Sequence, residues 1–261
     1  MLKKNVSFFT SPNPNESLIP RKDLFMSFRS PQNGYIYKIE THCHTSELSP
    51  CGNIPVRELI DRYAAAGYSA ITLCDHLRVG YTLPREGDRH AVADRMADVY
   101  ENAVEYGKTR GMRVYKGSEL CFDATCPDEF IMLGWDRSFL RRTVDLLDRE
   151  TVGEYHRRTL ARGGLLIQAH PFRGECLPVE GEAVDGYEIL NAHPRHDSKN
   201  DLAEKVGRAH GGIMTAGSDC HDPDVVGLSG IWVRSVPENT DEYISLLKSG
   251  DYGLIGKDEL K

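Results

Sequence analysis

Seven short apolar segments follow one another along the chain, and most lead through a loop into an amphipathic helical segment. The apolar segments cover residues 35–44, 68–76, 112–120, 130–135, 164–171, 186–196 and 212–221, and the expected helices cover residues 54–66, 89–110, 138–162, 198–210 and 240–249. Strands that alternate with helices predict a parallel sheet whose crossovers share one hand. Such a series either closes into a barrel or opens into a doubly wound sheet.

Polar and ionisable residues stand at the carboxyl ends of nearly all the apolar segments. Closure into a barrel brings these ends around one mouth, whereas an open sheet leaves some of them far apart. We therefore expect an α/β barrel with its functional site at the C-terminal ends of the strands. No GxGxxG motif follows the first segment and no Walker lysine is present, so nucleotide-cofactor and P-loop proteins have little support.

Two histidines, His42 and His44, stand one residue apart at the end of the first segment. On a strand they share a face, while Thr41 and Cys43 face the other side. Two imidazoles aimed at one point are typical of a metal site. The alternative is that the strand end simply exposes polar residues.

The other strand ends carry residues of the same kind, which give a set of His42, His44, Asp75, His76, Glu119, His170, His193, Asp219 and His221. Oxygen ligands mixed with imidazoles suit Zn, Mn or Fe in a catalytic site. Two or three ions that share a bridging carboxylate would use all of these ligands, and clustered cations suit phosphate binding and the generation of hydroxide. The alternative is a set of buried polar networks without metal.

Five motifs along the chain together resemble the PHP family, named for its polymerase and histidinol phosphatase members. They are HCHT at 42–45, LCDH at 73–76, SEL at 118–120, AHP at 169–171 and GSDCH at 217–221, and the resemblance spans about residues 36–233. It implies a distorted (β/α)7 barrel that holds a cluster of metal ions, usually three. Many members of the family are phosphoesterases.

The resemblance also implies roles for single residues. His42, His44, Glu119 and Asp219 would hold the first metal, Glu119 would bridge to a second metal bound by His170, and His76 and His221 would hold a third. Asp75 would orient an imidazole or bind a metal directly. This chain has Glu40 where the family usually has aspartate, no histidine near 128–130, and a loop in which Glu47, Cys51 or water would complete the outer site. The expected cofactors are therefore two or three divalent ions (Zn, Mn or Fe).

The activity expected from these residues is hydrolysis of a small phosphomonoester by metal-activated hydroxide. Arg173, Arg195 and Arg78 follow strand ends and are candidates to clamp phosphate oxygens. His193 or His196 would protonate the leaving alkoxide. The candidate catalytic residues are thus Asp75, His193, Arg173 and Arg195. The alternatives are a nuclease or phosphodiesterase and a non-catalytic, regulatory metal-binding domain.

The 261 residues carry a formal net charge of -7, which argues against nucleic acid as a partner and leaves a small phosphorylated substrate. Seven cysteines without a CxxC framework and the lack of a long apolar run indicate a cytoplasmic protein with reduced thiols and no membrane partner. Residues 1–34, rich in Pro, Asn and Ser, are expected to be an N-terminal extension to a barrel domain of residues 35–261.

Several further residues are expected to have only structural roles. Cys43 and Cys74 should face the core, as should Trp135. His156, within a predicted helix, should face solvent or cap the helix.

Overall fold

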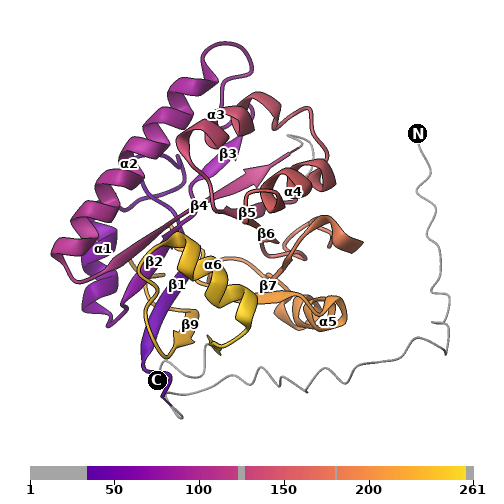
Figure 1. The fold of residues 1–261 in the computed structure, drawn as a ribbon. Helices are drawn as coiled ribbons and strands as arrows, with labels where there is room; N and C mark the ends of the chain where they lie inside the picture. Colours follow the sequence, from indigo (N-terminus) through magenta and orange to yellow (C-terminus); the bar gives the residue numbers. More distant parts are fainter. Residues whose placement is uncertain (1–33, 123–126, 180, 257–261) are drawn as a thin grey trace, which may run out of the picture.

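The computed structural model describes residues 34–122, 127–179 and 181–256 (Figure 1). Almost all of the proposed extension, residues 1–33, lies outside the described residues. The helices lie around the outside of a central sheet (Figure 1) and are α1 Val56–Ala65, α2 Arg89–Thr109, α3 Arg137–Leu146, α4 Val152–Leu160, α5 Asn200–His210 and α6 Thr240–Ser249, with a short 3-10 turn, η1, at Gly181–Ala183. None of the described helices combines the length and the apolar character needed to span a bilayer.

The described strands form one ten-stranded sheet in the order β10-β9-β1-β2-β4-β5-β6-β7-β8, with β3 paired to β4. Their bounds are β1 Tyr37–Cys43, β2 Ala70–Leu73, β3 His76–Arg78, β4 Arg113–Cys121, β5 Phe130–Leu133, β6 Leu165–Gln168, β7 Gly186–Asn191, β8 Ile213–Gly217, β9 Gly230–Val233 and β10 Gly253–Ile255.

The last strand of this series, β8, closes onto β1, while β9 and β10 continue the sheet on the other edge of β1. A parallel bridge joins Cys43 to Cys220, just after β8, and the Thr41 hydroxyl donates to the carbonyl of Ala216 in β8. The sheet is therefore a nearly closed barrel, as predicted, although its ten described strands differ from the seven of the expected (β/α)7 arrangement. It brings the C-terminal ends of β1, β4 and β8 together.

The prediction that all strands run parallel is wrong. Strand β5 pairs antiparallel with both β4 and β6, and β9 pairs antiparallel with β1. A parallel crossover needs a dozen or more residues, but only residues 122–129 link β4 to β5, and their described part contains no helix. The strict alternation of strand and helix is broken there.

The single helix predicted over residues 138–162 is in fact two helices, α3 and α4. The Thr151 hydroxyl accepts a hydrogen bond from the Glu154 amide, and the Glu154 carboxylate accepts one from the Thr151 amide. This capping box satisfies the first amides of α4 and starts a new helix.

Cys43, Cys74 and Trp135 are buried in the hydrophobic core, as predicted. His156 is also buried, which corrects the expectation that it faces solvent or caps a helix. Its ring lies 2.8 Å from the carbonyl oxygen of Glu182 and 3.0 Å from a carboxylate oxygen of Asp185. These acceptors come from the segment before β7, which packs over α4.

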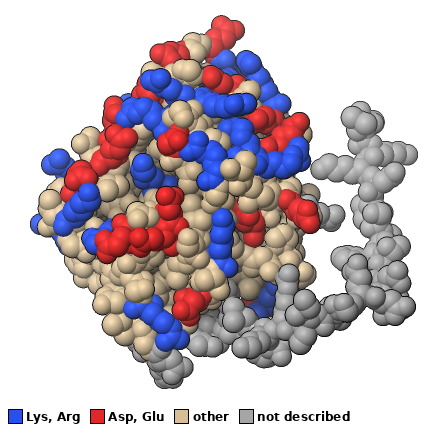
Figure 2. Space-filling model, in the orientation of Figure 1, with Lys and Arg blue, Asp and Glu red and all other residues tan. Residues whose placement is uncertain are grey.

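The outer helices carry both signs of charge. Figure 2 shows basic and acidic side chains interspersed over this face of the molecule. Between α2 and α3, Asp94 pairs with Arg141 at 2.7 Å and Asp98 pairs with Arg137 at 2.6 Å. Much of the charge on these helices is thus paired with charge of the opposite sign.

Candidate metal centre

Four side chains from three parts of the sheet meet at the barrel mouth. His42 and His44 end β1, Glu119 lies on β4, Asp219 follows β8, and all four are buried. The Nε2 atoms of His42 and His44 lie 3.1 Å apart, and Asp219 Oδ1 lies 3.4 Å and 3.1 Å from them. Glu119 oxygens lie 3.4 Å from His42 Nε2 and 3.5 Å from His44 Nε2.

Three of these donor atoms lie close to the spacing of ligands around one metal ion. Ligand bonds of about 2.0–2.2 Å to a tetrahedral ion place the donor atoms about 3.3–3.6 Å apart, and His42 Nε2, His44 Nε2 and Asp219 Oδ1 are separated by 3.1–3.4 Å. Glu119 lies beside them and turns a different oxygen toward each imidazole. In addition, the buried Oε2 atom of Glu119 has imidazole nitrogens of His44 and His76 as neighbours, at 3.5 Å and 3.0 Å, but no well-formed hydrogen bond from a described residue. The donor set therefore fits a divalent cation.

Neighbouring acceptors orient both imidazoles of β1. His42 Nδ1 lies 3.0 Å from Glu188 Oε1, and His44 Nδ1 lies 3.4 Å from Ser49 Oγ, which itself donates to Asp75. With the protons on Nδ1, the lone pairs lie on the two Nε2 atoms. Such contacts fix the tautomer and direction of metal-binding histidines.

A second group of donors shares Glu119. His170 Nε2 lies 3.2 Å from Glu119 Oε1 and 3.6 Å from Glu129 Oε2, and His76 Nδ1 lies 3.0 Å from Glu119 Oε2 and 3.6 Å from Glu129 Oε1. Glu119 thus stands between the first group and this one. That is the position of a bridging carboxylate.

Glu129 is a donor that the sequence reasoning missed. It immediately precedes β5, whereas the predicted ligands all stand at the C-terminal ends of strands. Because β5 is antiparallel to its neighbours, its N-terminal end lies at the barrel mouth. The acidic pair Asp128 and Glu129 was the available signal. Burial raises the pKa of Glu129 above its usual value.

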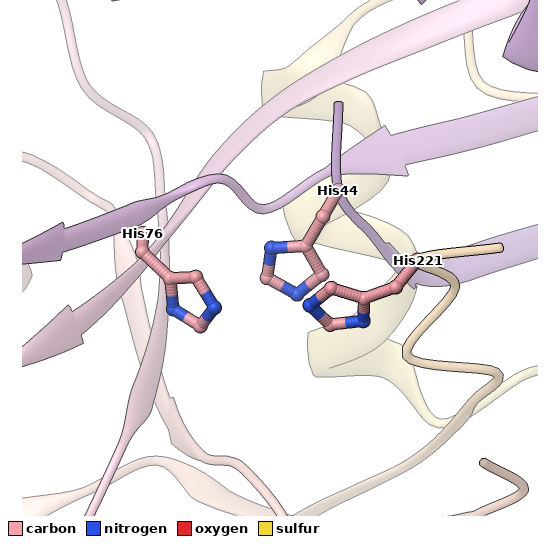
Figure 3. A group of neighbouring side chains, drawn as sticks. All are labelled: His44, His76 and His221. Atoms are coloured by element: carbon pink, nitrogen blue, oxygen red, sulfur yellow. The ribbon is translucent and has the colours of Figure 1, made fainter. Parts of the chain in front are cut away.

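A third group lies on the outer side of His44. Figure 3 shows the rings of His44, His76 and His221 gathered from β1, β3 and the loop after β8. The ring centroids of His44 and His221 are 4.1 Å apart. His221 Nδ1 lies 2.9 Å from the carbonyl oxygen of Asp219, so its proton has an acceptor and its Nε2 has the lone pair.

The electrostatics of the first group reflect its mixture of charges. Burial opposes ionisation of Glu119 and Asp219, but the adjacent His42 imidazole and its neighbours outweigh burial and hold both pKa values well below their usual range. For His42, burial is likewise outweighed by the carboxylates around it, which raise its pKa well above the usual value. Cations and protons therefore compete for this site.

Asp75 lies behind the cluster. Its carboxylate accepts hydrogen bonds from the Thr45 amide and from the hydroxyls of Thr45, Ser49 and Tyr100. Burial raises its pKa to about 6, although these hydrogen bonds act in the opposite direction. Asp75 is thus placed to orient His44 through Ser49.

Glu40 joins two strand ends. Its carboxylate accepts from the hydroxyls of Tyr63 and Ser218 and from the amides of Thr41, His42 and Ser218. Burial raises its pKa to about 7. Glu40 therefore ties β1 to the loop that carries Asp219.

Two of the donors have strained backbones. Among described residues other than glycine, only His170, Lys199 and Asp219 have positive φ, at 26°, 47° and 52°. Such conformations cost about 1–3 kcal/mol each and persist where the surroundings enforce them, often at functional sites. Here they direct His170 and Asp219 toward the cluster.

A cavity of about 550 Å³ opens beside the second and third groups. Three arginines lie along it, Arg78, Arg85 and Arg173, together with Tyr81 and His196. Arg173 Nη1 donates to Asp219 Oδ2 at 2.6 Å, so this guanidinium is held at the edge of the donor cluster.

Two predicted site residues, Arg195 and His193, do not line this cavity. Arg195 pairs with Asp222 and Asp224 and is not among the residues that line this cavity. The ring of His193 is buried beside His196, with centroids 4.6 Å apart, and also does not line the cavity. Burial lowers the pKa of His193 to about 4, so it is neutral near pH 7.

No protein-family model and no curated protein matches this sequence. Among solved structures, the chain is similar to PsfC from Pseudomonas syringae PB-5123, at 18% identity and a TM-score of 0.56 over 86% of this chain and 93% of that one. It is also similar to an amidohydrolase from Chromobacterium violaceum with bound sulfate and no metal, at 16% identity and a TM-score of 0.52 over 73% of this chain and 90% of that one. At these identities the similarity establishes a shared fold.

Proposed function

We propose that this protein is a metal-dependent hydrolase of the PHP type that acts on a small phosphomonoester. The observation that carries the proposal is the convergence of His42, His44 and Asp219 at metal-ligand spacing, with Glu119 beside them and shared by a second group of donors. A structural zinc site has four protein ligands and is closed, whereas this cluster borders an open cavity.

Basic residues beside the cluster can bind an anionic substrate. Arg173 stands at the edge of the donor cluster, and Arg78 and Arg85 lie along the same cavity, so guanidinium groups can bind the non-bridging oxygens of a phosphate. Bound cations would supply Lewis acidity and lower the pKa of a water molecule for attack on phosphorus. The related amidohydrolase structure holds sulfate, an anion of similar shape and charge to phosphate.

The test combines elemental analysis of the purified full-length chain with hydrolysis of p-nitrophenyl phosphate and a panel of phosphorylated metabolites in added Zn²⁺ or Mn²⁺. We expect at least two ions per chain, and loss of ions and of activity in His42→Ala and Asp219→Asn. Hydrolysis that persists in both variants would exclude this site. A chain that binds ions but hydrolyses no phosphoester would instead be a non-catalytic metal-binding domain.

A pair of arginine variants tests where the substrate lies. Arg173→Ala should lower kcat/KM at least tenfold, because Arg173 borders both the donors and the cavity. Arg195→Ala should change it less than twofold, because Arg195 pairs with Asp222 and Asp224 outside that cavity. Equal losses in the two variants would mean that the substrate also contacts Arg195, outside this cavity.

A further inference from the structure

The outer group of donors lacks one ligand. A cation held by protein usually has at least three protein ligands, and the outer group consists of His44, His76 and His221. His44 stacks between them, but its Nε2 atom lies 3.1 Å from both His42 Nε2 and Asp219 Oδ1 in the inner group. Since an imidazole has one lone pair to give, an outer cation needs another donor.

Glu47, one of two side chains in the following loop that sequence reasoning offers for this role, is already engaged. Both of its carboxylate oxygens lie 3.0 Å from the amide nitrogen of Val56, at the start of α1. It caps that helix and so has a role that requires no cation.

Cys51, the other side chain, lies beside the outer imidazoles. Its thiol is within hydrogen-bonding reach of His76 and His221, and it lines the cavity with both. Among the described cysteines, Cys51 is half-buried, whereas Cys43, Cys74, Cys121, Cys176 and Cys220 are buried.

Backbone contacts fix the loop that carries Cys51 against the loop that carries His221. The Asn53 amide donates to the His221 carbonyl at 2.8 Å, and the Asn53 side chain donates to Asp222 at 2.7 Å. Gly52 permits the tight path, because a Cβ atom there would lie 2.6 Å from the Thr45 carbonyl oxygen. The thiol is therefore held in place by its loop.

We propose that Cys51 is a thiolate ligand of an outer divalent cation, which it binds together with His76 and His221. The thiol loses its proton to solvent as the sulfur–metal bond forms, and no oxidation is involved. A soft sulfur ligand favours Zn²⁺ or Co²⁺ over Mn²⁺ or Mg²⁺ at this position, whereas the carboxylate-rich inner groups do not discriminate in this way. The inference rests on the proposed function, in which the cluster binds metal.

The test is a Co²⁺ titration of the metal-free full-length chain, followed by near-ultraviolet absorption. A thiolate bound to Co²⁺ adds a charge-transfer band that imidazole and carboxylate ligands do not give. We expect the band in the wild type and in Cys176→Ser, and its loss in Cys51→Ser, with one bound ion fewer per chain by elemental analysis. Cys176 is the matched control because it is a second thiol beside a donor, His170.

A second variant separates loss of the ligand from loss of the fold. Cys51→Asp replaces sulfur with an oxygen ligand, so it should restore the ion count without the band and shift the preference of the outer site toward Mn²⁺. Zn²⁺ should also protect Cys51 of the wild type from alkylation by iodoacetamide. In a His221→Ala variant, Zn²⁺ should give Cys51 no such protection.

The outcomes that oppose the inference differ from those that oppose the proposed function. A band that persists in Cys51→Ser, or disappears in Cys176→Ser, overturns the assignment of Cys51. Bound ions without any band in the wild type overturn it as well, while the proposed function stands. A chain that binds no ions at all overturns both.

Discussion

Replacing Glu188 with glutamine tests whether Glu188 fixes the tautomer of His42 that can bind a metal through Nε2. Glu188 is fully buried, and its Oε1 atom lies 3.0 Å from His42 Nδ1. Its Oε2 atom accepts from the His170 amide at 3.1 Å and from the Asn191 side chain at 2.9 Å. The glutamine carbonyl oxygen can keep those two contacts, which turns its NH₂ group toward His42 Nδ1.

The glutamine NH₂ and an Nδ1–H would then be two donors in contact. His42 escapes this conflict by moving its proton to Nε2, which is the atom 3.1 Å from His44 Nε2 in the candidate site. Loss of such a carboxylate partner typically lowers metal affinity 10–100-fold, which is about 1.4–2.7 kcal/mol. Folding should be affected less than in Glu188→Ala, which leaves the donors of His170 and Asn191 unpaired.

The assay is competition for Zn²⁺ against a chromogenic chelator, with Glu154→Gln as the control. Glu154 is an exposed carboxylate in the capping box of α4, so this variant removes the same charge far from the cluster. A dissociation constant for Glu188→Gln within threefold of the wild type would refute the reasoning. Equal weakening in the control would mean that net charge, and not the tautomer of His42, sets the affinity.

Three further predictions follow from single features of the structure. Gly186→Ala should destabilise the chain in urea by about 3 kcal/mol, because the new Cβ would lie 1.9 Å from the Ile213 carbonyl oxygen. Asp136 caps α3, and its hydrogen bond from Arg162 holds its pKa below the usual 3.8. Asp136→Ala should therefore lower the free energy of unfolding by about 1 kcal/mol at pH 7. This difference between the two proteins should disappear in melts as the pH falls below 3.8. Adding Zn²⁺ at a hundredfold excess over its dissociation constant should raise the melting temperature by about 5–10 °C relative to a chelator, and an unchanged melting curve would count against a metal site.

The convergence of the predicted ligands could be expected from the sequence because two local signals combine. Apolar runs mark strands, and the residues just after them mark strand ends. Since the C-terminal ends of parallel strands in a barrel share one rim, the side chains of β1, β4 and β8 had to be neighbours once closure was inferred. His42, His44, Glu119 and Asp219 are brought together in this way.

The direction of a strand could not be predicted from the local pattern of apolar residues. An apolar run such as that of β5 reads the same in either direction, and only the short link from β4 forces it to return antiparallel. Glu129, which precedes the strand, was therefore missed as a candidate ligand. The break between α3 and α4, in contrast, was visible as a Thr-x-x-Glu capping signature at 151–154.

Tertiary contacts decided the positions of other polar residues. The burial of His156 depends on a carbonyl and a carboxylate just before β7, and the position of Arg195 depends on Asp222 and Asp224. These partners are 25 to 30 positions away along the chain, beyond the reach of helical or strand periodicity. A long polar side chain can therefore be assigned to an element from sequence but not to a partner.

The hydrogen-bond acceptors around the imidazoles favour a metal site over a buried polar network. A network without metal pairs each donor with an acceptor. Here His42, His44 and His221 each have an acceptor for the Nδ1 proton, from Glu188, Ser49 and the Asp219 carbonyl. The lone pairs are thereby left on Nε2, and two of these meet at 3.1 Å next to carboxylate oxygens. An arrangement of acceptors facing acceptors, held partly by a strained backbone at Asp219, is stabilised only when a cation or protons lie between them.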